Sequence, residues 1–259
     1  MKIACIGGGP AGLYFAISMK LRDPDCVIDV YERNKPGDTF GWGVVFSDQT
    51  MDNLGRNDPA SAAAIGASLA HWDDIDVVIK GVTETSTGHG FCGIGRQKLL
   101  SLLQDRAREL GVGLHFEAEI GDELSAFADA DMIVASDGLN SKIRTRFAGS
   151  FKPDIELRRN KFVWLGTHKV FDAFTFIFVE TEHGWVWAHA YRFDDETSTF
   201  IVECAPETWE GLGFDGMDQD ECCRACEALF APWLDDHPLM SNARHLRGSA
   251  WLNFPRVLC

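Results

Sequence analysis

The stretch "IACIGGGPAGLYFAISM", residues 3–19, has the pattern of a β-strand that runs through a glycine-rich turn into an α-helix. Its glycines follow the spacing Gly7-x-Gly9-x-x-Gly12. Gly7 would make the tight turn, Gly9 would let the backbone approach a pyrophosphate, and Gly12 would let helix and strand pack closely. The helix N-terminus adds unpaired N–H groups and a positive dipole end, which favour phosphate. The stretch therefore predicts a dinucleotide site.

A carboxylate follows at the end of the next expected strand. The segment "CVIDVYE" ends at Glu32, twenty residues after Gly12, which suits a βαβ unit of about 30 residues. A carboxylate there would accept hydrogen bonds from the adenosine ribose and would repel a 2′-phosphate. This position disfavours NADP, whereas FAD and NAD both remain open.

Length, charge and hydropathy narrow the class of protein. The chain has 259 residues, which suits one or two domains. Its 24 Lys and Arg against 39 Asp and Glu give a net charge of −15, which argues against nucleic acid or an anionic membrane as partner. No apolar run reaches the roughly 18 residues of a membrane span. Met1-Lys2-Ile3 enters a strand directly, so we expect no signal peptide and a cytoplasmic location.

The cysteines do not indicate a metal site. Cys223 and Cys226 form one C-x-x-C pair, but no second pair follows at the spacing of a zinc finger. Cys222 and Cys226 instead recur with Leu229, Phe230 and Trp233 at helical spacing. We interpret them as core residues of a helix.

The chain shows two patterns, which predict an α/β protein with two domains. Residues 1–158 have the alternation of a Rossmann-like dinucleotide-binding domain, with 72–95 crossing toward a second sheet. Residues 159–259 are expected to form a mostly antiparallel β-sheet domain, because aromatic and β-branched segments joined by short polar turns begin near Phe162. One helix is expected near residues 217–231.

Two further motifs, together with the glycine motif, indicate a particular protein family. Arg96-x-x-Leu99-x-x-x-Leu103 opens a leucine-rich helix, and "ASDGLNSKIR" follows a strand expected at Met132–Ala135. With the glycine motif, in this order, they resemble the class A FAD-dependent aromatic monooxygenases. The segment "GDTFGWGVVFSDQTMDNL" is more narrowly similar to the N-terminal flavin part of salicylyl-CoA 5-hydroxylases and 2-aminobenzoyl-CoA monooxygenases. This resemblance extends over residues 1–259.

The resemblance implies which residues hold FAD. Arg96 would approach the FAD phosphates, and Asp137-Gly138 would contact the pyrophosphate region and serve the nicotinamide reductant. Ser136 stands where the family usually has alanine. The implied FAD residues are Gly7, Gly9, Pro10, Ala11, Gly12, Glu32, Arg33, Arg96, Asp137 and Gly138.

The resemblance also implies the reaction. NAD(P)H would reduce FAD, oxygen would add to give a flavin C4a-hydroperoxide, and this species would hydroxylate an activated aromatic acyl-CoA. The protein would position the substrate and exclude water. No nucleophilic side chain is needed, and His189 is the one weak candidate for a catalytic role.

Strict alternation along "GWVWAHAYRF" places one aromatic row on a single strand face. Its members Trp187, His189 and Tyr191 could line a flat substrate pocket, although packing against helices would need the same row. The strand "STFIVEC" supplies no cation for a free carboxylate, which suits a thioester. The basic residues of "LRRNK" are either contacts for a CoA tail or a solvated linker; they are Arg158, Arg159 and Lys161.

Three alternatives remain open: a flavin hydroxylase of a free aromatic or indolic substrate, an NAD-dependent dehydrogenase, and a fragment that binds a nucleotide without turnover. A homodimer is also left open. After "GSAWLNFPRVLC" the family would continue with a strand, a Gly-Asp motif and a helix. We therefore expect a fragment that lacks this part of the fold and exposes apolar surface.

Overall fold

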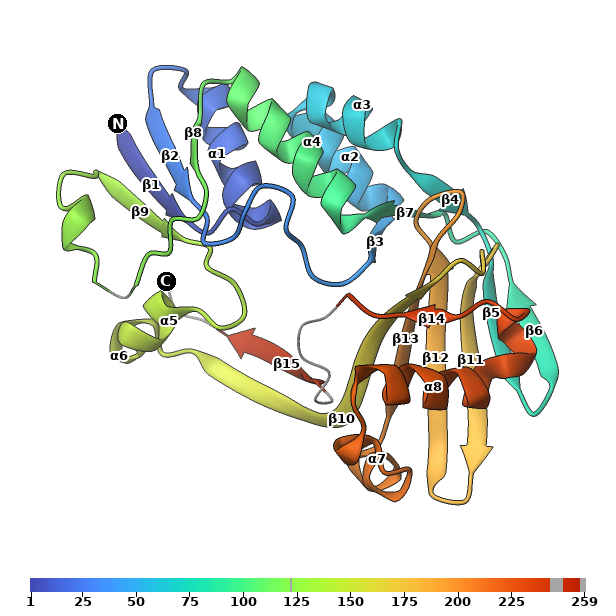
Figure 1. Cartoon of the computed structure of the whole chain (residues 1–259). Helices are drawn as coiled ribbons and strands as arrows, with labels where there is room; N and C mark the ends of the chain where they lie inside the picture. Colours follow the sequence, from blue (N-terminus) through green and yellow to red (C-terminus); the bar gives the residue numbers. More distant parts are fainter. Residues whose placement is uncertain (122, 243–248, 257–259) are drawn as a thin grey trace.

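The computed structural model describes residues 1–121, 123–242 and, for the backbone alone, 249–256. A parallel sheet near the N-terminus has the strand order β8-β2-β1-β9. Helices α1 and α4 lie over one of its faces (Figure 1). The bounds are β1 Lys2–Ile6, α1 Pro10–Arg22, β2 Val27–Tyr31, α4 Arg96–Glu109, β8 Gly113–His115 and β9 Met132–Ala135. These elements form the predicted Rossmann-like unit.

Apolar side chains fix this arrangement on both faces of the parallel sheet. Ile3 and Cys5 of β1 are buried against Leu13 and Ile17 of α1 and against Leu103 of α4. Alternation along β1 turns Ala4 and Ile6 to the other face, where they join a smaller core. Its other buried members are Phe127 and Ile143, from the 3-10 turn Ser125–Phe127 and from α5, Lys142–Arg146.

A small antiparallel sheet and two helices follow the first βαβ unit. The bounds are β3 Gly43–Ser47, α2 Asp48–Asn57, α3 Pro59–Gly66, β4 Ala70–Trp72 and β7 Phe91–Gly95. Ser47 caps α2, because its Oγ accepts a hydrogen bond from the N–H of Thr50 at 3.4 Å.

The third sheet has the order β14-β10-β13-β12-β11-β5-β6, and β15 pairs with β10. Strand β5 pairs with β11 in parallel, so the hairpin between residues 72 and 95 belongs to this sheet. The strand bounds are β5 Ile75–Ile79, β6 Val82–Ser86, β10 Asp154–Thr167, β11 Phe174–Thr181, β12 Gly184–Arg192, β13 Ser198–Cys204, β14 Leu239–Met240 and β15 Ser249–Arg256. The short elements nearby are α6 Ala148–Phe151, α7 Pro206–Gly211 and the 3-10 turn Phe214–Gly216.

Helix α8, Gln219–Leu234, covers one face of this sheet. Cys222 and Cys226 of this helix are buried in the core between the helix and the sheet. Burial raises the pKa of the Cys223 thiol to about 11 and that of Cys204 on β13 to about 12, so these thiols stay protonated. Within the described part of the chain no group of three or more Cys, His, Asp or Glu could hold a metal ion.

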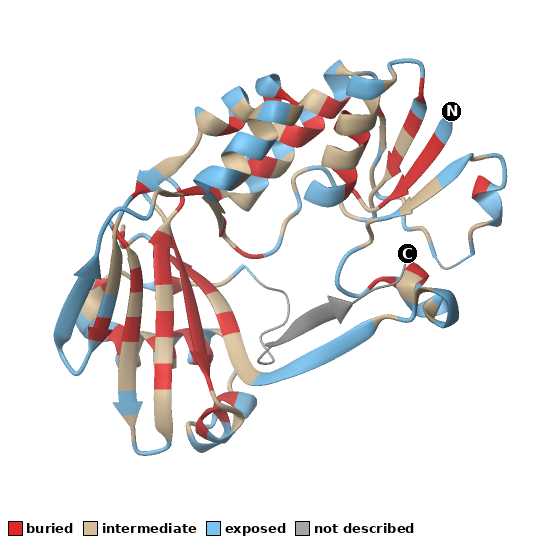
Figure 2. Cartoon of the chain, turned by 180° about the vertical axis from the view of Figure 1, so that it is seen from behind, coloured by how far each residue is buried: buried red, intermediate tan, exposed pale blue. Residues whose placement is uncertain are grey.

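Strand β10 joins the two parts of the molecule. Its first residues, from Asp154 to Arg159, are exposed, and its last residues, from Leu165 to Thr167, are buried (Figure 2). The domain division between residues 158 and 159 falls inside this continuous strand, and it stays a prediction. Among the described residues, no helix has the length and apolar character needed to cross a membrane.

Candidate functional site

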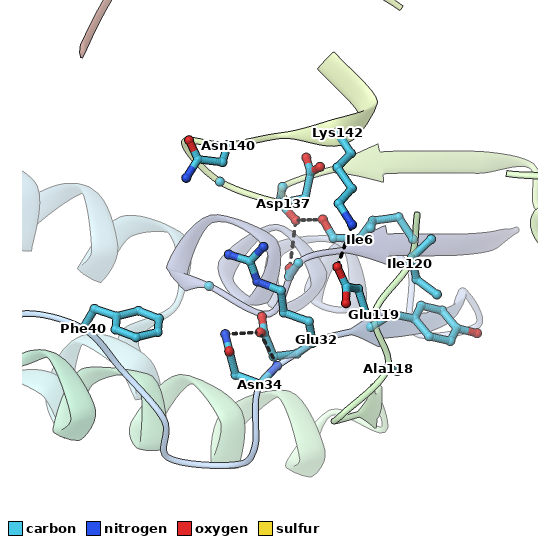
Figure 3. A pocket seen from close by; sticks show the side chains of 16 residues that line it. Ile6, Glu32, Asn34, Phe40, Ala118, Glu119, Ile120, Asp137, Asn140 and Lys142 are labelled. Carbon is cyan, nitrogen blue, oxygen red and sulfur yellow. Dashed lines mark hydrogen bonds and ion pairs between the residues drawn. The ribbon is translucent and has the colours of Figure 1, made fainter. Parts of the chain in front are cut away.

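A pocket of about 190 Å³ opens at the carboxyl ends of the parallel strands (Figure 3). Ile6 ends β1, Tyr31 ends β2, and Ser136 follows β9. In open α/β sheets, ligands bind in the crevice outside these strand ends. The pocket is lined by Ile6, Gly7, Gly9, Tyr31, Glu32, Arg33, Asn34, Phe40, Ala118, Glu119, Ile120, Ser136, Asp137, Gly138, Asn140 and Lys142.

The three glycines of the turn differ in what surrounds them. Gly7 has φ +108°, and a Cβ there would lie 2.1 Å from the carbonyl oxygen of Ser136. A Cβ on Gly12 would lie 2.2 Å from the carbonyl oxygen of Gly7. A Cβ on Gly9 would meet nothing within 4 Å. Gly7 and Gly12 are therefore required by packing, whereas Gly9 borders open space in the pocket, where a phosphate fits.

The N-terminus of α1 can take an anion. Gly9 is its N-cap, and no side chain of the described residues caps the helix. Its first N–H groups thus remain available to a ligand, with the positive end of the helix dipole behind them. Pro10 at the first helical position has no N–H to satisfy and suits this place.

The Glu32 carboxylate is held by its neighbours. Its Oε2 accepts a hydrogen bond from the N–H of Gly8 at 2.8 Å. Its Oε1 accepts two from Asn34, from the backbone N–H at 2.8 Å and from the side-chain amide at 2.7 Å. Because a carboxylate has about four acceptor positions, one is left for a ribose hydroxyl. The sequence patterns do not point to Gly8 and Asn34.

Asp137 stabilises the turn after β9 through hydrogen bonds. Its Oδ1 accepts a hydrogen bond from the Ser141 hydroxyl at 2.5 Å, and Ser141 Oγ in turn accepts one from the N–H of Arg144, which caps α5. Ser136 donates to the carbonyl oxygens of Ile6 at 3.0 Å and Gly7 at 2.9 Å. The serine that departs from the family pattern therefore ties β9 to the glycine turn.

An ion pair forms part of the lining of the pocket. Lys142 Nζ lies 2.6 Å from Glu119 Oε1, and this hydrogen bond lowers the pKa of the Glu119 carboxyl (Figure 3). Glu119 follows β8 and Lys142 begins α5. The sequence motifs do not point to either residue, although the rule that ligands bind at strand ends applies to the residues after β8.

Four residues expected to hold the cofactor do not line this pocket: Pro10, Ala11, Gly12 and Arg96. Pro10 and Ala11 line a neighbouring apolar groove of about 410 Å³ between α1, α2 and α4. Arg96 begins α4, and its guanidinium lies over the ring of Trp164, 5.3 Å from the centroid. Burial lowers the pKa of Arg96, partly offset by the nearby Tyr191.

The predicted aromatic row of β12 faces away from α8, which covers the alternate residues Val186 and Ala188. The register aligns His189 with Phe176 on β11 and Ile201 on β13. We call this surface the aromatic face: Phe174, Phe176, Phe178, Trp185, Trp187, His189 and Tyr191. The row therefore does not serve to pack α8.

Polar groups on the aromatic face differ in their surroundings. The hydroxyl of Tyr191 is already used, because it donates to the carbonyl oxygen of Gly43 at 3.0 Å. Burial lowers the pKa of His189, with the charge of Glu203 acting weakly against it. Trp187 lies opposite Glu203, a buried carboxylate that accepts a hydrogen bond from Asn160 at 2.9 Å.

The basic cluster expected to contact a CoA tail is exposed. Arg158 pairs with Glu156 at 2.8 Å, and Arg159 pairs with Glu207. Both cations therefore already have carboxylate partners in the chain itself. Surface pairs of this kind contribute little energy, so a ligand phosphate could replace them at small cost.

Comparison with known proteins adds sequence relatives, although no family model matches the chain. Salicyloyl-CoA 5-hydroxylase from Streptomyces sp is 43% identical over 262 residues, which cover 98% of this chain and 50% of that protein. The chain thus spans about half the length of this relative. Protodeoxyviolaceinate monooxygenase from Chromobacterium violaceum is 32% identical over 266 residues, 98% of this chain and 67% of that protein.

Solved structures share the fold at low sequence identity. 2-Methyl-3-hydroxypyridine-5-carboxylic acid oxygenase has a TM-score of 0.74 at 16% identity, covering 97% of this chain and 70% of that chain. For p-nitrophenol 4-monooxygenase from Pseudomonas putida the TM-score is 0.71 at 14% identity, covering 97% and 66%. The parallel sheet, the antiparallel sheet and the relatives agree: the chain belongs to the class A flavin-dependent aromatic monooxygenases.

Proposed function

We propose that this chain is the FAD-binding part of a monooxygenase that hydroxylates an aromatic acyl-CoA with NAD(P)H and O2. The observation that carries the proposal is the pocket at the strand ends, where the open side of Gly9, the Glu32 carboxylate and Asp137 meet. A glycine turn, a helix N-terminus and a ribose-binding carboxylate are what an adenine dinucleotide needs.

The residues present fit FAD. Glu32 would bind the adenosine ribose, and Gly9 with the first turn of α1 would bind the diphosphate. Asp137 and Gly138 would lie beside the diphosphate at the end of β9. When bound, FAD would supply the redox chemistry that activates oxygen, and the side chains of this chain would bind, orient and shield the reactants.

The aromatic face would take the acceptor ring. Trp187 offers a flat surface, and His189 is kept neutral by the burial that lowers its pKa, so its ring can accept a hydrogen bond from a ring hydroxyl or amino group. Glu203 beside Trp187 would repel a free carboxylate. Together with the salicyloyl-CoA 5-hydroxylase relative, this supports a thioester as substrate.

A free aromatic or indolic substrate is the second candidate. Arg96 places a cation close to Tyr191 and over Trp164, a contact that the strand patterns do not reveal. A cation there could receive a substrate carboxylate. The relationship to protodeoxyviolaceinate monooxygenase points the same way.

Substrate-stimulated NAD(P)H oxidation distinguishes the thioester hypothesis from the hypothesis of a free aromatic or indolic substrate. The complete monooxygenase, of which this chain is the proposed FAD-binding part, would be loaded with FAD and assayed with salicylyl-CoA, 2-aminobenzoyl-CoA and the two free acids, and products would be identified. We expect stimulation and hydroxylated product with the thioesters only, and a loss of both in Trp187→Leu. Equal or greater stimulation by the free acids would reject the thioester. If the protein binds FAD but forms no product, the alternative of a nucleotide-binding protein without turnover is favoured.

A further inference from the structure

Two tryptophans and two glycines interlock the segment before β3 with strand β10. A Cβ on Gly166 of β10 would lie 2.5 Å from the ring of Trp42, and a Cβ on Gly41 would lie 3.0 Å from the ring of Trp164. The ring of Trp42 therefore packs on Gly166, two residues after Trp164. The ring of Trp164 packs on Gly41, the residue before Trp42. We call Gly41, Trp42, Trp164 and Gly166 the tryptophan–glycine interlock.

The interlock is fixed by hydrogen bonds to its backbone. The side-chain amide of Asn242 accepts from the N–H of Gly41 at 3.1 Å and donates to its carbonyl oxygen at 2.7 Å. On the other side, the N–H of Gly43 donates to the Thr199 hydroxyl at 2.9 Å. Gly41 has φ +77°, which other residues adopt at a cost. The segment is therefore held in one conformation.

Both tryptophans of the interlock contact Arg96. The N–H of Arg96 donates to the carbonyl oxygen of Trp42 at 2.8 Å. Its guanidinium lies over the ring of Trp164 at 5.3 Å. Among the described residues, no oxygen atom accepts a hydrogen bond from this guanidinium. Arg96 is thus a half-buried cation whose orientation is set by an aromatic ring and whose donors remain available to an anion.

We propose that Trp164 is a positioning residue, which holds the Arg96 guanidinium ready to bind the diphosphate of FAD. A guanidinium stacked on an indole keeps its hydrogen-bonding edge free, and less side-chain entropy is lost when an anion binds. Gly41 and Gly166 let the two indoles approach closely enough to form this support. The inference rests on the FAD site proposed above.

The test is a double-mutant cycle with FAD affinity as its readout, measured by flavin fluorescence. Arg96→Met should weaken FAD binding about 10- to 100-fold, as expected when a charge-assisted hydrogen bond is lost. Trp164→Leu should weaken it about 3- to 20-fold through loss of the cation–π contact. Trp164→Phe should bind nearly as the parent does, because the indole N–H of Trp164 is buried without a hydrogen-bond partner among the described residues.

The decisive comparison is Trp164→Leu in the Arg96→Met background, where we expect no further loss of FAD affinity. An equal loss in both backgrounds would show that Trp164 does not act through Arg96, and would overturn the inference. If Arg96→Met has no effect while Glu32→Ala weakens binding, the inference fails and the FAD site stands. If neither substitution has an effect, the proposed function itself fails.

Melting temperatures identify variants that do not fold. Should Trp164→Leu be one of them, replacement of tryptophan by tetrafluorotryptophan keeps the ring shape and removes the negative face that attracts a cation. Fluorination should then weaken FAD binding in the parent and leave Arg96→Met unchanged. A loss of the same size in both proteins would overturn the inference.

Discussion

The nucleotide pocket and the aromatic face are built in different ways. The pocket is made of backbone and of carboxylates held by near neighbours: Glu32 by Asn34, and Asp137 by Ser141. The aromatic face is made of side chains that β11 and β12 bring into register, such as Phe176 and His189. A short stretch of sequence therefore determines the geometry of the first region, whereas the second depends on strand pairing over long distances.

The largest expected effect is a loss of stability on substitution of Gly7, which Gly9 of the same turn should not show. Gly7→Ala places a methyl group 2.1 Å from the Ser136 carbonyl oxygen at φ +108°, and it should cost about 3 kcal/mol or more of stability. Gly9→Ala meets no atom within 4 Å, so the fold should persist while FAD binding weakens. Urea denaturation and flavin titration of both variants check this pair. Equal stability of the two would contradict the packing of the turn.

Glu32 tests whether the pocket recognises the adenosine half of a dinucleotide. Glu32→Ala should weaken FAD binding 10- to 100-fold, from loss of a charge-assisted hydrogen bond of about 1.5–3 kcal/mol. Flavin titration measures the loss, with the exposed Glu84→Ala as matched control. Unchanged affinity in Glu32→Ala would reject this role of Glu32.

The contrast between the two regions also marks what could be predicted from sequence. Spacing alone located the Rossmann-like unit and the strand Met132–Ala135, because each depends on local patterns. The family resemblance assigned Glu32 and Asp137 to the same cofactor, and both line one pocket because parallel strands end at one edge of the sheet. These are interactions between residues close in sequence or in adjacent strands.

Other features depend on contacts that no local pattern encodes. Alternation predicted the aromatic row, but not that α8 would cover the opposite face of β12. The contact of Arg96 with Trp164 joins residues on α4 and β10, and the pair of Glu119 and Lys142 joins the segment after β8 to the start of α5. Each requires the register and packing of distant segments.

Within the aromatic face, Tyr191 and Trp187 should behave differently. Tyr191→Phe leaves the buried carbonyl oxygen of Gly43 without its donor and should cost about 1–2 kcal/mol of stability. Trp187→Leu should lose less stability and more substrate affinity, because the ring is only partly buried. Urea denaturation and substrate titration compare the two. A stable Tyr191→Phe with lost substrate affinity would assign the hydroxyl to the substrate instead.

The smallest expected effect is a pH dependence from His189. Burial lowers its pKa below the ordinary value of 6.5. Between the folded pKa and 6.5 the unfolded chain binds a proton that the folded chain lacks, so the free energy of unfolding falls as the pH drops through this range. His189→Phe should flatten this slope, and the exposed His71→Phe should not. Parallel slopes for His189→Phe and the parent would contradict the buried, neutral imidazole.

The pocket at the strand ends is proposed to bind the adenosine diphosphate half of FAD. Equilibrium titration of the purified chain with FAD, FMN and ADP tests it most directly. FAD should bind, ADP should compete with it, and FMN, which lacks the adenosine, should bind far more weakly. Glu32→Ala should reduce the preference for FAD over FMN. Equal binding of FMN and FAD, or FAD binding that ADP does not displace, would contradict the assignment of this pocket.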